Sequence, residues 1–444
     1  MKKILILEDD AERLEAFRAA VASLGRGVEL VSWRDTATMA AECDAHLGDA
    51  HLISLDHELK VAGNADSVPG VEAAEFLAKY PPICPVILHA PNGERTWQME
   101  YALQFAQWTT ERIQPSGDWI QTEWLPRARG MVSKANSPAK WHKRPSDHAG
   151  RVARAELSLL GLSVGDAFGA CFFGEQKAVE ERLSKRRMPP PKWVNTADTM
   201  MTISIVEVLK RFGEINQDAL ARAFAEKYQR QPNRGYGAMA CQVLQQIGQG
   251  KDWRKVARDV FGGMGSMGNG GAMRAAPIGA YYGDKVGDVI EQAARSAEVT
   301  HAHPEGQAGA VAAALAASWT TTHSRTRANP LDMLQFCEAF TPSGVTRAGI
   351  QKALSLSLEQ PVRAAASTLG NGSAVISSDT IPFALWCAAR HLHNFIEAMW
   401  TTVSGLGDRD TNCAIVGGIV APSVGREGIP RDWLDAREPL PFQP

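Results

Sequence analysis

The chain has 444 residues, which is enough for two or three domains of ordinary size. Its 47 Lys and Arg residues nearly balance 49 Asp and Glu residues, so a net charge of -2 gives no global attraction to nucleic acid or anionic lipid. Hydrophobic residues at 45% and charged residues at 22% exclude disordered and fibrous classes, and no apolar stretch reaches the roughly 18 residues that span a bilayer.

The first 125 residues alternate short apolar runs with amphipathic stretches, starting at MKKILILEDD. This opening runs into acids where a signal peptide would stay apolar, so we expect a cytoplasmic protein. Strands separated by helices predict a parallel sheet, and residues 1–125 are therefore expected to form an α/β domain of flavodoxin-like order. The predicted strands, of which the last is the weakest, cover residues 4–7, 28–31, 51–55, 85–88 and 119–122.

Acidic residues follow the first and third of these strands. Asp9 and Asp10 come after the first strand and Asp56 ends the third, an arrangement that predicts a metal or phosphate site at the carboxyl edge of the sheet. These residues resemble response-regulator receiver domains, with Asp56 at the phospho-acceptor position. The fourth strand, however, ends in His89-Ala90-Pro91-Asn92 in place of a small hydroxyl residue, and no clear Lys ends the fifth.

The sequences LDHEL at 55–59 and HAPN at 89–92 are more similar to the variant called cyclic-phosphate-processing receivers. His89 could act there as an acid or base, or be a neutral hydrogen-bonded histidine, and both interpretations stay open. The resemblance implies a receiver-domain site made of Asp9, Asp10, Asp56, His89 and Asn92.

Residues 126–148 are rich in Pro, Ser, Lys and Arg and have no periodicity, which predicts a solvated linker, with a basic binding arm as the less favoured alternative. From residue 149 to 444, long Ala-rich segments have helical apolar spacing and β-branched alternating runs are scarce. We therefore predict a second, all-α domain.

Short polar motifs interrupt this helical sequence. GDAFG at 165–169 has two glycines that permit a close approach of backbones, with Asp166 between them. TADT at 196–199 is typical of a helix N-terminus. GNGGAMR at 268–274 is either a plain turn or a cradle for a phosphate or a sugar edge.

GDRDT at 407–411 puts two carboxylates and a hydroxyl next to each other before an apolar helix. These are the hard oxygen ligands that Mg²⁺ takes, and helix capping by Asp410 or Thr411 does not explain Asp408. One oxygen-rich site from two distant segments is predicted, made of Thr196, Asp198, Asp408, Asp410 and Thr411.

Six motifs in order, GDAFG, TADTMMT, GNGGAMR, SAEVTHAHPEG, LGNGS with DTIPFAL, and GDRDTNCAIVGGI, resemble the ADP-ribosylglycohydrolase family, including dinitrogenase reductase-activating glycohydrolases. The resemblance runs from Val152 to about Pro422. It implies an all-α fold with two Mg²⁺ ions that hold the ribose diol while ADP-ribose is removed from a modified protein side chain or a related ADP-ribosyl conjugate. The expected partner is ADP-ribose or an ADP-ribosylated protein; membranes and nucleic acid are not expected partners, with ADP-ribosylated nucleic-acid ends left open.

The resemblance also implies residue roles. Catalysis falls to Asp198, Asp408 and Asp410. The metal ligands are Thr196, Asp198, Asp408, Asp410 and Thr411. Substrate contacts fall to Asp166, Gly268, Asn269, Gly270, His301, Gly370, Asn371 and Gly372.

Two positions depart from the family pattern. The family usually has consecutive aspartates where this chain has Ala197-Asp198, so one metal site is expected to be weakened. Either the chain is a natural ADP-ribose-binding reader with weak catalysis and a signalling receiver module, or it is a hydrolase deliberately disabled to trap a ligand, which the intact remaining motifs favour. The family also places a Glu soon after GDAFG, where this chain has ACFFGEQ, so Glu175 comes late.

Overall fold

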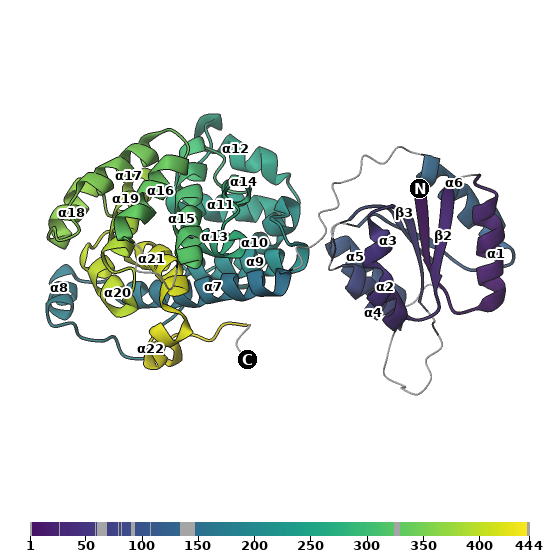
Figure 1. Ribbon diagram of the computed structural model, residues 1–444, viewed down its shortest axis with the longest axis horizontal. Helices are drawn as coiled ribbons and strands as arrows, with labels where there is room; N and C mark the ends of the chain where they lie inside the picture. Colours follow the sequence, from purple (N-terminus) through teal and green to yellow (C-terminus); the bar gives the residue numbers. More distant parts are fainter. Residues whose placement is uncertain are drawn as a thin grey trace. The chain divides into compact units, whose positions relative to one another are not determined.

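A computed structural model describes residues 2–25, 27–57, 59, 69–78, 80, 82–89, 94–106, 108–133, 147–323 and 329–441. The chain divides into two compact units, Met1–Pro145 and Ser146–Pro444 (Figure 1). No helix in the described part of the chain is both long and apolar enough to cross a bilayer.

The first unit contains a five-stranded parallel sheet with the strand order β2-β1-β3-β4-β5. This confirms the predicted flavodoxin-like order. Its strands are β1 (Lys2–Leu7), β2 (Val28–Trp33), β3 (Ala50–Asp56), β4 (Val86–His89) and β5 (Thr110–Ile113). Its helices are α1 (Ala11–Ala22), α2 (Thr36–Glu42), α3 (Asp44–Leu47), α4 (Pro69–Leu77), α5 (Glu94–Phe105), the π-helical η1 (Ile120–Trp124) and α6 (Leu125–Ser133).

Both faces of this sheet are buried, because alternate residues of each strand enter different apolar clusters. Leu5 and Leu7 of β1 pack with residues of α2, α3, α4 and α5, whereas Ile4 and Ile6 pack with residues of α1, η1 and α6. The carboxyl edge of the sheet therefore stands on a rigid, two-sided core.

The predicted fifth strand at 119–122 is wrong. Trp119, Ile120 and Trp124 recur at helical spacing and pack on Phe17, so this segment forms η1 against the sheet. The true β5, Thr110–Ile113, is an edge strand whose charged and half-buried residues gave a weak signal. The segment predicted as a linker, 126–148, also begins inside α6, and residues 134–146 lie outside the described ones.

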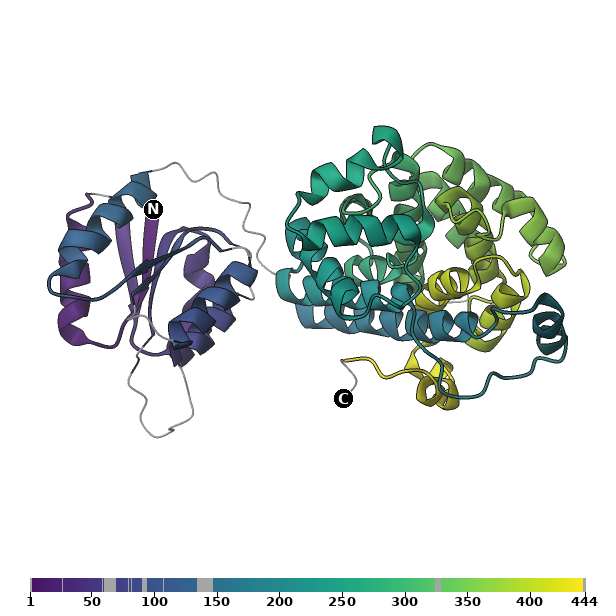
Figure 2. The same cartoon turned by 180° about the vertical axis from the view of Figure 1, so that it is seen from behind.

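The second unit is built of helices, as predicted, and its described residues contain no strand beyond two isolated bridges, Trp193 with Arg437 and Gly268 with Ile376 (Figure 2). Its helices are α7 (His148–Ala170), α8 (Gln176–Ser184), α9 (Ala197–Phe212), α10 (Gln217–Arg230), α11 (Ala238–Gly248), α12 (Trp253–Gly263), η2 (Asn269–Gly271), α13 (Ala276–Tyr282), α14 (Val286–Glu298), α15 (Pro304–His323), α16 (Pro330–Phe340), α17 (Val345–Ser355), α18 (Val362–Leu369), α19 (Ser377–Arg390), α20 (Phe395–Ser404), α21 (Arg409–Val424), η3 (Arg426–Gly428) and α22 (Arg431–Ala436).

Helices α7 and α21 pack with their backbones almost in contact, through glycines spaced four residues apart on one face of α7. A Cβ atom at Gly161, Gly165 or Gly169 would come within 2.0 to 2.4 Å of atoms of α21, chiefly carbonyl oxygens. The two glycines of GDAFG thus serve the close approach predicted from the sequence. This contact brings Asp166 beside the N-terminus of α21.

Candidate functional site

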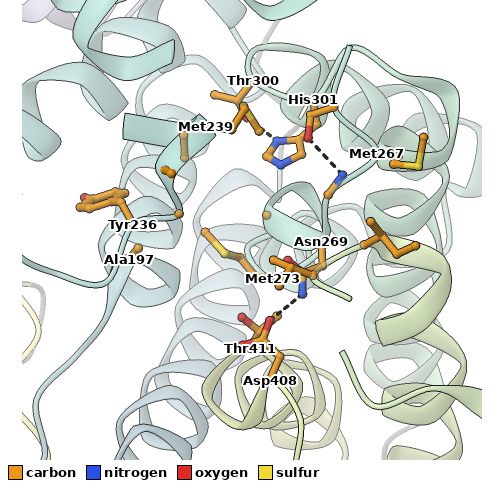
Figure 3. A pocket seen from close by; sticks show the side chains of 18 of the residues that line it. Ala197, Tyr236, Met239, Met267, Asn269, Met273, Thr300, His301, Asp408 and Thr411 are labelled. Carbon is orange, nitrogen blue, oxygen red and sulfur yellow. Dashed lines mark hydrogen bonds between the residues drawn. The ribbon is translucent and has the colours of Figure 1, made fainter. Parts of the chain in front are cut away.

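A cavity of about 580 Å³ opens in the helical unit and is lined by residues of α9, α11, α12, η2 and α21 and the loops between them. Figure 3 shows Asp408 and Thr411 at one end, Thr300 and His301 at the other, and Asn269 between them. The first end is acidic, and much of the remaining wall is apolar.

Asp166 lies under the acidic end and holds the start of α9. Its carboxylate accepts hydrogen bonds from the Thr196 N–H (2.9 Å), the Thr196 hydroxyl (2.7 Å), the Thr199 N–H (3.2 Å) and the Thr199 hydroxyl. Three of these donors converge on Oδ2 and only one reaches Oδ1, so Oδ1 keeps a lone pair. Burial nevertheless raises the pKa of Asp166, against the lowering effect of those bonds.

Asp198 is in the first turn of α9, whose N-cap is Thr196. Its Oδ2 lies 3.2 Å from the Thr196 hydroxyl, whereas the buried Oδ1 has no hydrogen-bond partner. Burial, followed by repulsion from Asp166, Asp410 and Asp408, raises the pKa of Asp198 well above its usual range. A buried carboxylate with a bare oxygen among other acids is a place that a cation would stabilise.

Asp408 and Asp410 lie at the N-terminus of α21. The Asn269 amide donates to Asp408 Oδ2 at 2.7 Å, and the Thr411 N–H donates to Asp410 Oδ1 at 2.9 Å. Burial and the charge of Asp408 raise the pKa of Asp410 well above its usual range. Oxygen atoms of Asp166, Asp198 and Asp410 all lie within 4.8 Å of one another, so this group could hold a metal ion.

The turn at 268–270 separates the acidic group from His301. Gly268 pairs with Ile376, and a Cβ atom at Gly270 would lie 2.8 Å from His301 Cε1. The buried Arg274 fixes the turn from behind by donating to the Gly270 carbonyl (2.9 Å) and to the Thr300 hydroxyl (2.9 Å).

His301 is buried at this end of the cavity and its Nδ1 lies 2.7 Å from the Thr300 hydroxyl. Burial, and then the nearby charge of Arg274, lowers the pKa of His301 to about 3. The imidazole is therefore neutral at physiological pH.

Gly370, Asn371 and Gly372, predicted to contact substrate, are not among the residues that line the cavity. They lie behind Asp408 instead: the Asn371 carbonyl accepts from the Asp408 N–H (3.1 Å), and a Cβ atom at Gly372 would lie 2.7 Å from that of Asp408. Their contacts fix the position of the carboxylate, and Ala374, Val375 and Ile376 provide the wall nearby.

The two departures from the family pattern have clear positions. Ala197 lines the cavity (Figure 3) and directly precedes Asp198 at the start of α9. Glu175 is exposed and caps α8 by accepting from the backbone N–H groups of Lys177 and Ala178, so it is not part of this group. In the same segment after GDAFG, Phe173 contacts the start of α21: the Arg409 guanidinium lies over its ring, 5.0 Å from the ring centre.

The apolar part of the cavity was missed by sequence reasoning, because its residues form no polar motif. Phe261 and Val375 both adopt left-handed backbone conformations (φ 52° and 56°) while their side chains stay largely exposed at the cavity. The available signal was the density of glycines from 262 to 271, which indicates an irregular backbone. The other apolar residues of this part are Tyr236, Met239, Met264, Met267 and Met273.

In the first unit, the sheet edge groups Asp56 and His89 with Glu8, and their ligand atoms lie within 4.8 Å of one another. Asp10 caps α1 by accepting from the N–H groups of Glu12 and Arg13, and neither it nor Asp9 belongs to that group. Asn92 lies outside the described residues.

A comparison with protein families matches residues 147–441 to the family described as ADP-ribosylglycohydrolase. Among similar curated proteins, "ADP-ribosylhydrolase ARH3" of Xenopus tropicalis is 30% identical over 337 residues, covering 64% of this chain and 91% of that protein. The Gallus gallus protein of the same name is 31% identical over 331 residues, covering 64% and 89%. A solved structure titled "ADP-ribosylglycohydrolase-related protein complex" covers 65% of this chain and 93% of its own, at 25% identity and a TM-score of 0.48.

Proposed function

The chain belongs to the ADP-ribosylglycohydrolase family, and on that premise we propose that it is a Mg²⁺-dependent hydrolase that releases ADP-ribose from a modified protein side chain or a related ADP-ribosyl conjugate. The observation that carries this proposal is the bare Oδ1 of Asp198 inside a buried group of acids. Asp198, Asp408 and Asp410 are the proposed catalytic residues, and the reaction is proposed for the cytoplasm.

The residues present fit divalent cations. A cation relieves the repulsion among the carboxylates of Asp166 and Asp198, which are buried, and Asp410, which is partly buried, and Mg²⁺ prefers oxygen ligands of this kind. The carboxylates of Asp198, Asp408 and Asp410 would hold it, with the hydroxyls of Thr196 and Thr411. Asp166 accepts hydrogen bonds from the start of α9 and so positions Thr196 and Asp198, while its Oδ1, which accepts only one of them, could also contribute to the metal group. When bound, Mg²⁺ orients the ribose hydroxyls and lowers the pKa of a water molecule.

The chain's own residues supply the remaining requirements for cleavage at an anomeric carbon. Asp410 accepts a proton from the attacking water, whose oxygen bonds to the anomeric carbon as the glycosidic bond breaks, and the departing acceptor atom takes a proton from solvent. Asp408, held by Asn269, stabilises the positive charge that develops on the ribose. The backbone of Gly268 and Gly270 lines the cavity, where its peptide groups can contact the sugar and phosphates.

The apolar part of the cavity fits the adenine base. Phe261, Met264 and Met267 are exposed at its wall, where a planar base would cover them. The cavity volume lies within the range of 300 to 1,000 Å³ that is usual for small-molecule sites.

Ala197 removes one carboxylate from this arrangement. With two ions expected, one loses a ligand, so we propose that the present chain binds ADP-ribose and turns over slowly. An ADP-ribose reader that retains the cavity but performs no hydrolysis is the second candidate, and Ala197 is the observation that favours it.

The experiment measures Mg²⁺-dependent release of ADP-ribose from Arg-, Ser- and Thr-ADP-ribosylated proteins by the chain, by Ala197→Asp and by Ala197→Asn. The Asp variant is expected to release ADP-ribose at least about tenfold faster, while the Asn variant, of similar size but without charge, gains nothing. The preferred acceptor follows from the same assay. If ADP-ribose binds but neither the chain nor the Asp variant releases it from any substrate, the reader is correct and the hydrolase is refuted.

A further inference from the structure

The cluster of Glu8, Asp56 and His89 lies at the carboxyl edge of the sheet, outside the family match at 147–441. We infer that it is a second metal site, of mixed nitrogen and oxygen ligands, that takes a divalent transition ion such as Zn²⁺ or Mn²⁺. The inference concerns the other unit and does not depend on the proposed hydrolase.

The fold fixes the positions of these three side chains without a bound ion. The register of the sheet pairs Asp56 of β3 with His89 of β4, and Glu8 directly follows the neighbouring strand β1. All three are buried, with exposures of 0% for Glu8, 3% for Asp56 and 0% for His89. The His89 ring is stacked on Trp119, with 5.3 Å between ring centres, and Phe17 contacts it at 5.6 Å.

Two buried atoms of this cluster have no hydrogen-bond partner, namely Glu8 Oε2 and His89 Nε2. Each belongs to a side chain whose other atom is already engaged. Glu8 Oε1 accepts from the Asp10 N–H at 3.0 Å, and His89 Nδ1 lies 3.0 Å from the Ser54 hydroxyl. The unengaged atoms therefore point into the cluster.

The spacing of these atoms fits a shared ion. Glu8 Oε2 and His89 Nε2 are 3.3 Å apart. Ligand atoms held about 2.0 to 2.2 Å from a tetrahedral or octahedral ion lie about 3 to 3.5 Å from each other. An imidazole ligand favours transition ions over Mg²⁺, and two carboxylates balance a charge of +2.

The hydrogen bond between Ser54 and His89 determines which ring nitrogen of His89 carries the proton, and so whether Nε2 can bind a metal ion. Its hydroxyl oxygen accepts from the Trp124 ring N–H at 3.0 Å. If it also accepts from His89 Nδ1–H, the Nε2 lone pair faces the carboxylates, as a metal ligand requires. If Ser54 donates to Nδ1, Nε2–H faces Glu8 and the cluster is an internal His–Glu pair, which is the outcome opposed to ours.

Arg13 places a positive charge beside the carboxylates of this cluster. Its guanidinium lies 3.7 Å from Glu8 Oε2 and 3.7 Å from Asp56 Oδ2, and its side chain is 40% exposed. At such distances and exposure it makes only a weak ion pair. An ion at the centre would replace this charge, and Arg13 can turn outward to solvent.

The test titrates Zn²⁺ into the metal-free full chain carrying Asp198→Asn, which disables the oxygen-only group of the helical unit. Calorimetry is expected to find one tight equivalent, which His89→Gln and Asp56→Asn each abolish. His51→Gln, a change at a half-buried histidine of β3 outside the cluster, keeps it. Circular dichroism checks that the variants are folded.

X-ray absorption at the Zn edge needs no change in the cluster itself. One imidazole in the shell of the bound ion is expected. An all-oxygen shell, or a His89→Gln chain that binds as much Zn²⁺ as its parent, overturns the inference in favour of the internal pair.

Discussion

Gly270 leaves no room for a side chain at the turn between the acidic group and His301. In Gly270→Ala the new methyl group would lie 2.8 Å from His301 Cε1 and 2.9 Å from Nε2, so the turn or the ring must shift. We expect ADP-ribose affinity to fall at least about tenfold, because the turn backbone is proposed to contact the ligand. Calorimetric titration with ADP-ribose and Mg²⁺ measures this.

Gly287→Ala is the matched control, since a Cβ atom at this position of α14 meets nothing within 4 Å. Its affinity should be unchanged. Equal affinities in the two variants would remove the turn from the binding site.

His301 makes the stability of the helical unit depend on pH. Its pKa is lowered to about 3 by burial and by Arg274, so the unfolded chain takes up a proton below about pH 6.5 and the folded chain does not. Stability is therefore present above that pH and is lost as pH falls. Between pH 7 and pH 5, His301 should lower the free energy of unfolding by roughly 2 kcal/mol, because each pH unit below the pKa of the unfolded chain costs about 1.4 kcal/mol.

Urea unfolding of the chain and of His301→Asn at both pH values measures the difference. The variant should lose less stability on acidification. Identical losses would mean that His301 is protonated in the folded state.

At the scale of elements, two carboxylates of the acidic site should respond in opposite ways to the same change. Asp166→Asn loses acceptors for the donors at the start of α9, so we expect destabilisation by roughly 2 to 5 kcal/mol. Asp198→Asn replaces a carboxyl group whose pKa is already raised by burial and repulsion, so metal-free stability at pH 8 should hold or rise while Mg²⁺-dependent binding is lost.

Thermal melts with and without Mg²⁺ and ADP-ribose distinguish the two variants. If both lose the same stability, Asp166 has no special structural role.

The contact of α7 with α21 predicts a further result. In Gly165→Ala the Cβ atom would lie 2.0 Å from the Cys413 carbonyl oxygen. Because this oxygen belongs to the backbone of α21, the clash can be relieved only if the two helices move apart. We expect several kcal/mol of destabilisation and loss of Mg²⁺-dependent binding, measured by urea unfolding and calorimetry. Gly150→Ala, on the same helix with its closest neighbour at 3.8 Å, should change neither.

The sequence predicted elements and site residues unevenly, for physical reasons. Thr196, Asp198, Asp408 and Asp410 could be found because each lies at a helix start, where capping and ligand motifs are local. The role of Asp166 could not, since its donors are some thirty residues away and only the fold brings them together.

The sheet edge gives the same lesson. Three consecutive acids follow β1, and only the direction of the chain into α1 decides that Glu8 faces His89 while Asp10 caps the helix. The fifth strand was missed because its edge position removes the apolar signal that marks the inner strands.

At the scale of the whole molecule, each unit has an apolar core of its own. We expect calorimetric melting of the full chain to show two transitions. ADP-ribose with Mg²⁺ at about 100 times its Kd should stabilise one of them by about 2.7 kcal/mol. A fragment of residues 147–444 should reproduce that transition and its shift; a shift of both transitions by ADP-ribose would contradict independent units.

The glycine face shared by α7 and α21 has a consequence for synthesis of the chain. Asp166 is made early in the helical unit and Asp410 near its end, so the ribosome must deliver α21 before the acids can meet. Until α21 is synthesised, the glycine face of α7 has no helix to pack against. Products that stop short of α21 therefore lack the proposed site, and on the proposed function only chains that include α21 should be captured by ADP-ribose.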